Sequence, residues 1–227
     1  MGLVLVKLAS LSCYNKGMRL FLSSERLGKF GSKLPELVGK GKNAVYIMNA
    51  ADLKPNRQEY ALSVKADLEA LGFNATELDL RQFFDGKQDI GELLSAQDLV
   101  WVAGGNTFVL NRAMQQSGFK QAVQPLVQRD KLVFGGWSAG AIIATPSLHG
   151  TEWGDNPEVV PDGYPSEIIW EGLGLVPFYI IPHYNSDWRG DKARLMEKYL
   201  KEQQLPFEIL EDGQVVIVKD DHVEKLI

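Results

Sequence analysis

The sequence contains little cysteine, little histidine and no excess of positive charge. Cys13 is the only cysteine among 227 residues, so no disulfide can form within the chain, and we expect a reducing, cytoplasmic environment. The formal net charge is -5, without a run of like charges or a low-complexity tract. We therefore expect no nucleic-acid partner and no anionic membrane partner, because both require a dense basic face.

Long apolar runs and metal-binding motifs are also absent. No stretch approaches the roughly 20 apolar residues of a membrane-spanning helix. The sequence has no cluster of Cys and His and no H-E-x-x-H motif, so we expect neither a metal nor another cofactor. Hydrophobic residues make up 45% and charged residues 23%, as in globular proteins with one large core.

The first 17 residues do not fit the pattern of strands and helices that the rest of the chain shows. The apolar start "MGLVLVKLASLSC" faintly resembles a signal peptide, but Lys7 interrupts it and no basic segment precedes it. A first strand is expected at "MRLFLSS", which begins at Met18. We therefore expect a single domain over residues 18–227, with residues 1–17 as an upstream extension or a misassigned start.

Short apolar runs alternate with amphipathic helical segments along the chain. Strands are expected in residues 18–24, 43–51, 74–80, 98–105, 131–136 and 172–186. Helices are expected in residues 56–72, 89–97, 106–118, 119–130 and 190–203, and a loop with a helix in residues 26–39. This alternation predicts an α/β fold: a single-domain sandwich with a mostly parallel central sheet and helices on both faces. Residues 206–227 are expected to form a hairpin with Asp212-Gly213 at its turn.

Three polar stretches follow predicted strands, at residues 103–108, 135–141 and 182–187. Ligands of such sheets bind beyond the carboxyl ends of the strands. In the second stretch, Gly136-Trp137-Ser138-Ala139-Gly140 fits the G-x-S-x-G elbow, which exposes a nucleophile on a tight strand-to-helix turn. The alternative is a glycine-rich turn with an incidental serine.

A serine hydroxyl needs a base and an orienting acid to act as a nucleophile. His183 follows an apolar run and is the best base candidate, whereas His149 lies in a loop and His222 is expected on the surface. The acid stays open among Asp155 and Glu152 in the acidic loop, and Glu211 and Asp212 near the C-terminus.

The first polar stretch, "AGGNTF", could form the other half of an oxyanion hole. Gly104 and Gly105 allow the backbone to approach a substrate carbonyl, and Asn106 and Thr107 offer side-chain contacts. A helix N-cap at the same residues is a compatible interpretation.

The motifs "GGNTF", "GWSAGA" and "PHY", in this order, resemble those of the peptidase E group, the S51-type aspartyl dipeptidases, from about Met18 to the C-terminus. The resemblance implies a class I glutamine amidotransferase-like fold. It also implies Ser138 as nucleophile, His183 as general base, and the backbone N–H groups of Gly105 and Ala139 as oxyanion donors. It assigns the acid in two ways, to Asp155 or to Asp212, with Glu211 one residue away.

Members of the peptidase E type remove an N-terminal aspartate from dipeptides, which requires a cation near the site. Arg189, Lys192 and Arg194 could bind the substrate carboxylate, or could lie on a solvated helix face.

We therefore expect a cytoplasmic serine exopeptidase that hydrolyses short peptides through an acyl-enzyme, as a monomer or homodimer. One alternative is an amide hydrolase or acyl transferase of the glutamine amidotransferase type. The serine nucleophile and the Tyr184-Asn185 that follows His183 argue against it. The other alternative is a non-catalytic α/β ligand-binding protein.

Overall fold

The structure is a computed structural model that describes residues 17–227. The expected extension over residues 1–17 therefore lies outside the described residues, apart from Gly17.

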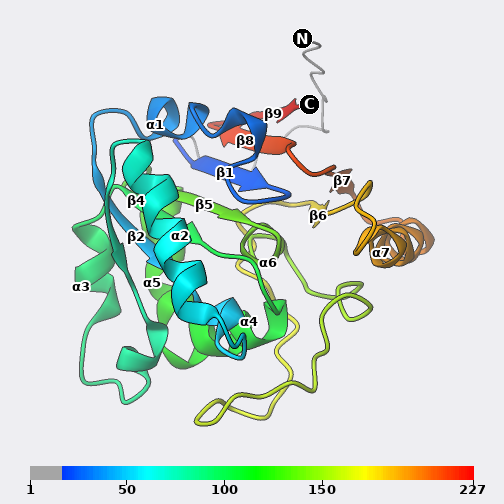
Figure 1. The fold of residues 1–227 in the computed structure, drawn as a ribbon, viewed down its shortest axis with the longest axis horizontal. Helices are drawn as coiled ribbons and strands as arrows, with labels where there is room; N and C mark the ends of the chain where they lie inside the picture. Colours follow the sequence, from blue (N-terminus) through cyan, green and yellow to red (C-terminus); the bar gives the residue numbers. More distant parts are fainter. Residues whose placement is uncertain (1–16) are drawn as a thin grey trace.

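A seven-stranded sheet with the order β3-β2-β4-β5-β1-β8-β9 forms the centre of the molecule (Figure 1). Its strands are β1 (Arg19–Ser23), β2 (Asn43–Ile47), β3 (Asn74–Glu77), β4 (Leu99–Val102), β5 (Val133–Trp137), β8 (Val215–Lys219) and β9 (His222–Leu226). The first five strands pair in parallel, whereas β8 runs antiparallel to β1 and β9 antiparallel to β8. The predicted single-domain, mostly parallel α/β architecture is confirmed.

Helices cover both faces of this sheet. They are η1 (Gly28–Phe30), α1 (Lys33–Val38), η2 (Asn49–Ala51), α2 (Arg57–Ala70), η3 (Leu80–Phe83), α3 (Ile90–Ser95), α4 (Thr107–Gln116), α5 (Phe119–Gln128), α6 (Ala139–Ile142) and α7 (Gly190–Glu202). None of these helices, all within residues 17–227, has the length and apolarity that a bilayer crossing requires.

Each central strand contributes side chains to two separate cores. In β1, Leu20 and Leu22 join the cluster that includes α4, α5 and α6, whereas Phe21 joins the cluster that includes α1 and α2. Successive side chains of a strand point to opposite faces, so a strand buried on both sides must be apolar throughout. This is why the central strands read as continuous apolar runs.

A small second sheet carries the third polar stretch. Strands β6 (Tyr179–Ile181) and β7 (Phe207–Ile209) pair in parallel, and α7 packs on them through Ala193, Met196 and Leu200. The strand expected over 172–186 is thus limited to three residues, and His183 follows it directly after Pro182.

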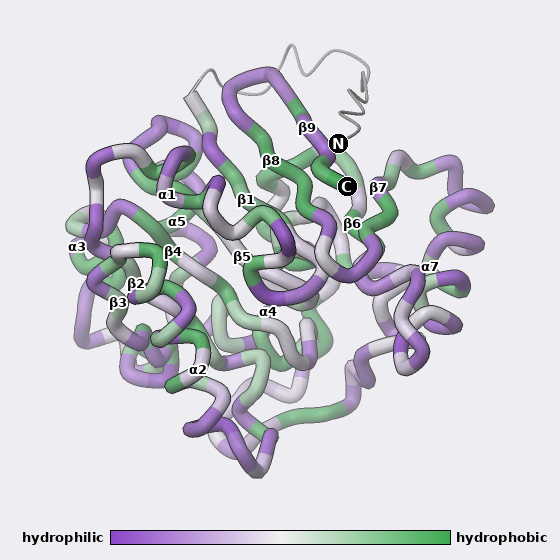
Figure 2. The backbone as a smooth tube through the Cα atoms, turned by 45° about the horizontal axis from the view of Figure 1, so that its top comes forward, coloured by the Kyte–Doolittle hydropathy of each residue, from purple (hydrophilic) through white to green (hydrophobic). Residues whose placement is uncertain are grey.

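The predicted hairpin turn at Asp212-Gly213 is wrong. These residues join β7 to β8, which belong to different sheets, and the hairpin is formed by β8 and β9 around Asp220 and Asp221. Asp220 adopts φ 57°, a left-handed conformation that aspartate tolerates better than most residues. Figure 2 shows apolar β8 in green and this polar turn in purple.

Arg112 holds the long connection between α6 and β6. It is fully buried on α4, and its guanidinium donates to the carbonyls of Pro157 (2.8 Å), Val159 (3.3 Å), Ser166 (3.3 Å) and Glu167 (3.0 Å). Burial lowers the pKa of this guanidinium. The side chain therefore fixes a connection that has little regular structure of its own.

Replacing Arg112 by methionine should lower the free energy of unfolding by at least about 1–3 kcal/mol, because the carbonyls would lose their buried donor. Urea denaturation measures this loss, and limited proteolysis should cut first between residues 157 and 167. Exposed Arg129 at the end of α5 is the matched control, and Arg129→Met should stay within about 0.5 kcal/mol of the wild type. Equal effects of the two substitutions would contradict this role.

Candidate active site

A cavity of about 460 Å³ opens at the carboxyl ends of the parallel strands. Of the residues singled out in the sequence, it brings together Gly104, Gly105, Ser138, Asp155, His183 and Arg189. The other lining residues are Glu25, Arg26, Lys54, Tyr60, Trp137 and Trp188. All three expected polar stretches thus contribute residues to one cavity.

Ser138 lies on a strained turn between β5 and α6. Its φ is 51° and its ψ is -116°, a backbone conformation that L-residues rarely adopt. Close packing forces this turn, because a Cβ on Gly140 would lie 2.1 Å from the carbonyl oxygen of Val102 in β4. These are the features of a nucleophile elbow, which presents the Ser138 hydroxyl to the cavity.

The buried imidazole of His183 is bound on one side by a carboxylate. Its Nδ1 lies 2.7 Å from Asp212 Oδ1, and the buried Ser24 hydroxyl donates to the same oxygen at 2.8 Å. Because Asp212 accepts, Nδ1 carries the proton and Nε2 is left as an acceptor. Nε2 is buried and has no hydrogen-bond partner within residues 17–227.

The surroundings of His183 keep it neutral. Burial lowers the pKa of the imidazole below its ordinary value of 6.5, while the hydrogen bond and charge of Asp212 act in the opposite direction. The charge of Arg189 lowers the pKa further. At neutral pH, Nε2 is therefore available to take a proton.

Asp155, the first candidate for the acid, contacts other groups. One carboxylate oxygen accepts from the N–H (2.9 Å) and hydroxyl (2.6 Å) of Thr107, and the other accepts from Arg189 (2.5 Å). No hydrogen bond between described residues joins it to His183. The contact expected of the acid is instead made by the alternative candidate, Asp212.

The remaining acid and histidine candidates lie away from the His183 ring nitrogens. The backbone N–H of exposed Glu211 donates to Gln214, and Glu152 accepts from the Gly150 N–H. His149 stacks on Trp170 at 4.1 Å between ring centroids, and the side chain of His222 is 81% exposed.

In the "AGGNTF" stretch, the polar side chains cap α4 or bind Asp155, and the glycines line the cavity. Asn106 caps α4 by accepting from the N–H groups of Phe108 and Val109, and Thr107 binds Asp155, so neither side chain lines the cavity. Gly105 does line it, and a Cβ there would lie 2.1 Å from the Ala50 carbonyl oxygen. Within the described chain, no hydrogen bond occupies the N–H groups of Gly105 and Ala139.

The three cations expected near the site lie in different environments. Arg189 lines the cavity but is paired with Asp155, while Lys192 lines a different, smaller pocket. Arg194 is an exposed side chain that lies near Asp191 at 3.5 Å. A carboxylate of a ligand would therefore need another cation.

Sequence reasoning missed the cavity residues that follow β1 and β2. Glu25 and Arg26 come after β1, and Lys54 and Tyr60 come after β2. No motif marks these residues, but both groups follow apolar strands that point toward the same edge of the sheet. Ligands bind beyond the carboxyl ends of such strands, so the residues after these two strands were also candidates.

Within residues 17–227, no group of three or more His, Cys, Asp or Glu side chains is arranged to hold a metal ion.

Comparisons with known proteins agree on one family. The model of Peptidase family S51 matches residues 20–226. A Drosophila melanogaster protein named "Probable alpha-aspartyl dipeptidase" is 29% identical over 214 residues, covering 89% of this chain and 83% of the relative. A Streptomyces coelicolor "Peptidase E" is 35% identical over 150 residues, covering 63% of this chain and 58% of the relative.

A solved structure shares the fold. A Listeria monocytogenes protein of known crystal structure superposes with a TM-score of 0.75 at 23% identity, covering 92% of this chain and 98% of that one. This likeness shows that the two proteins share the same α/β fold.

Replacing Asp212 by asparagine should lower the pKa of His183 further, because the carboxylate charge that favours the imidazolium is removed while burial remains. An NMR titration of the imidazole measures this shift. The wild-type midpoint should lie below pH 6.5, and the variant midpoint lower still. A midpoint that rises in the variant would contradict the contact with Asp212.

Replacing Ser24 by alanine should move the His183 pKa in the opposite direction. Without the hydroxyl that donates to Asp212 Oδ1, the carboxylate concentrates more charge on the imidazole and favours its protonated form. Ser23, the last residue of β1, is the matched control, because it is equally buried next to Ser24 and its hydroxyl donates to the Arg26 carbonyl. The same titration should show no shift in Ser23→Ala.

Proposed function

Since the chain belongs to peptidase family S51, we propose that it is a serine-type exopeptidase that hydrolyses short peptides through an acyl-enzyme. The observation that carries this proposal is the cavity shared by Ser138, on its strained elbow, and His183, whose Nε2 is buried without a partner. A nucleophile and a base that face one cavity are what acyl transfer requires.

In the proposed reaction, Ser138 Oγ attacks the scissile carbonyl carbon while His183 Nε2 takes the hydroxyl proton. Asp212 stabilises the resulting imidazolium through Nδ1, and Ser24 holds the Asp212 carboxylate in place. The neutral state of His183 at pH 7 suits this role, because a base must be unprotonated before the attack.

The N–H groups of Gly105 and Ala139 are proposed to stabilise the negative oxygen of the tetrahedral intermediate. The close contact between Gly105 and the Ala50 carbonyl, and the tight turn at Ser138, fix both donors before substrate binds. Fixed donors need no reorganisation during the reaction, and each contributes about 3–4 kcal/mol in comparable enzymes.

The intermediate collapses when His183 Nε2 gives its proton to the leaving amine. A water molecule, deprotonated by the same nitrogen, then attacks the acyl-enzyme and regenerates Ser138. Each step uses one proton carried by one imidazole.

The name of the Drosophila melanogaster relative, "Probable alpha-aspartyl dipeptidase", supports dipeptides with an N-terminal aspartate as substrates. A cavity of about 460 Å³ has the size of a small-ligand site and suits a short peptide. The cytoplasmic location and the monomeric or dimeric state expected from the sequence stay predictions.

Incubation with a serine-reactive phosphonate should add a single phosphonyl group to the protein, at Ser138. Ser138→Ala should gain no mass and should lose hydrolysis of Asp-Leu by roughly 10⁶-fold, the cost of losing the nucleophile in a serine peptidase. Ser95→Ala, at an exposed position of α3 outside the cavity, is the control and should be labelled like the wild type. Equal labelling of wild type and Ser138→Ala would mean that the peptidase mechanism is wrong.

A further inference from the structure

Most charged side chains of the cavity already have a partner. Asp155 binds Arg189 at 2.5 Å, and Arg26 binds Asp67, which lies outside the cavity. Lys54 forms neither an ion pair nor a side-chain hydrogen bond within residues 17–227. A cation at a cavity wall without a carboxylate is available to a ligand carboxylate.

A continuous aromatic wall connects Lys54 with the nucleophile. Its ammonium lies 4.6 Å from the centre of the Tyr60 ring. That ring packs edge-on against Trp137, at 6.1 Å between centroids, and Trp137 precedes Ser138 in the chain. The ammonium is therefore held beside the elbow by a cation–π contact.

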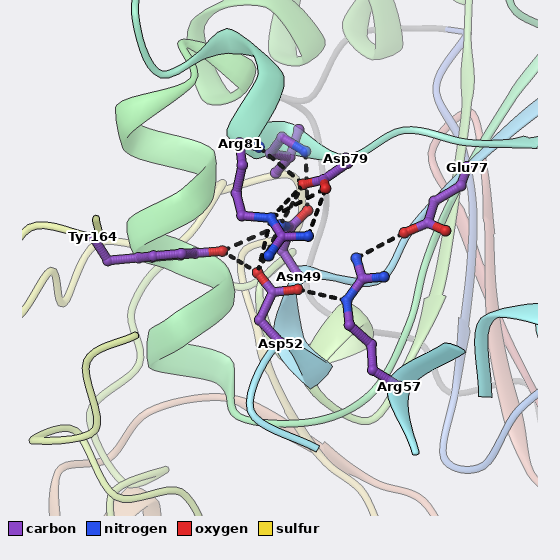
Figure 3. A network of polar contacts seen from close by, with 8 residues as sticks. Asn49, Asp52, Arg57, Glu77, Asp79, Arg81 and Tyr164 are labelled. Carbon is purple, nitrogen blue, oxygen red and sulfur yellow. Dashed lines mark hydrogen bonds and ion pairs between the residues drawn. The ribbon is translucent and has the colours of Figure 1, made fainter. Parts of the chain in front are cut away.

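The turn that carries Lys54 is fixed by a dense polar network (Figure 3). Asp52, whose side chain is 2% exposed, accepts from Arg57 at 2.7 Å, from Asn49 at 2.9 Å and from the Tyr164 hydroxyl. Arg57 also binds Glu77 at 2.7 Å. A buried carboxylate with several donors keeps its geometry, so the turn is rigid before any ligand binds.

The same turn also touches the proposed oxyanion hole. The Ala50 carbonyl accepts from the Asn106 N–H at 2.8 Å, next to Gly105. The Lys54 N–H donates to Ala51 at 2.9 Å and its carbonyl accepts from Arg57 at 3.1 Å. Lys54 is thus attached at a fixed position relative to the carbonyl-binding site.

The sheet order decides which part of a peptide Lys54 can reach. From β5, which ends one residue before Ser138, β2 lies on one side beyond β4, and β1 lies on the other side. His183 contacts Ser24, which follows β1, whereas Lys54 follows β2. In Figure 1, β2 and α2 accordingly lie to the left of β5, and β6 and α7 to its right.

His183 must protonate the leaving amine, so the leaving residue lies on the His183 side of Ser138. The acyl residue, which is the first residue of the substrate, then lies on the Lys54 side. We propose that Lys54 is the specificity-determining residue that binds the carboxylate of an acidic side chain on this first residue. This inference rests on the proposed function and adds the group that selects the substrate.

Three dipeptide substrates and three variants test the proposal. Lys54→Met should lower kcat/KM for Asp-Leu and for Asp-Leu-amide by about 10- to 100-fold, the loss expected for one charge-assisted hydrogen bond. The same variant should leave Asn-Leu unchanged, because its neutral side chain does not use the ammonium. Lys54→Arg should keep the preference for Asp-Leu. Lys65→Met, on α2 outside the cavity, should match the wild type.

Three kinetic results would overturn the proposal. They are no effect of Lys54→Met, an equal loss for Asp-Leu and Asn-Leu, and a loss that disappears when the C-terminus is amidated. The last result would assign Lys54 to the terminal carboxylate instead of the side chain.

A binding measurement separates this inference from the proposed function. In Ser138→Ala, which cannot turn over, calorimetry should show tighter binding of Asp-Leu than of Asn-Leu, and adding Lys54→Met should abolish the difference. If the wild type hydrolyses none of the peptides, the proposed function fails, and this binding difference still decides the role of Lys54. Equal binding of the two dipeptides to Ser138→Ala would overturn that role.

Discussion

The hydrogen bond between Asp212 and His183 is the contact on which the site depends. It joins the connection between β7 and β8 to the end of β6, and Ser24 attaches both to the end of β1 in the central sheet. This contact therefore fixes the small second sheet against the large sheet. The same carboxylate positions the buried imidazole and opposes the lowering of the His183 pKa that burial causes.

Backbone strain accompanies this arrangement at Ser138 and at His183, the proposed nucleophile and base. Among the described residues, six non-glycine residues have positive φ, and Ser138 (51°) and His183 (131°) are two of them. Such conformations cost of order 1–3 kcal/mol each and persist where the surrounding packing permits no other. Here the contact of Gly140 with Val102 and the buried strands on both sides of β5 supply that packing.

The sequence predicts the sheet and its helices well, and it also singles out Ser138 and His183, which line the same cavity, because buried strands and a G-x-S-x-G elbow leave strong local patterns. The acid is ambiguous for a physical reason: Asp155 and Asp212 are both loop carboxylates, and only the folded chain shows that Thr107 and Arg189 occupy the first. The predicted hairpin turn at Asp212-Gly213 is wrong for a similar reason, since Asp212 binds His183 and does not lie in a hairpin. No sequence motif marks Lys54. Its proposed role in substrate binding follows from its lack of an ion-pair partner within residues 17–227.

The most direct test of the central claim is a crystal structure of the protein after reaction with a serine-reactive phosphonate. We expect a covalent bond from Ser138 Oγ to phosphorus, with one phosphoryl oxygen about 2.7–3.1 Å from the N–H groups of Gly105 and Ala139. We also expect His183 Nε2 to face the adduct while Nδ1 stays on Asp212. An adduct on another residue, or an imidazole turned away from Ser138, would contradict this mechanism.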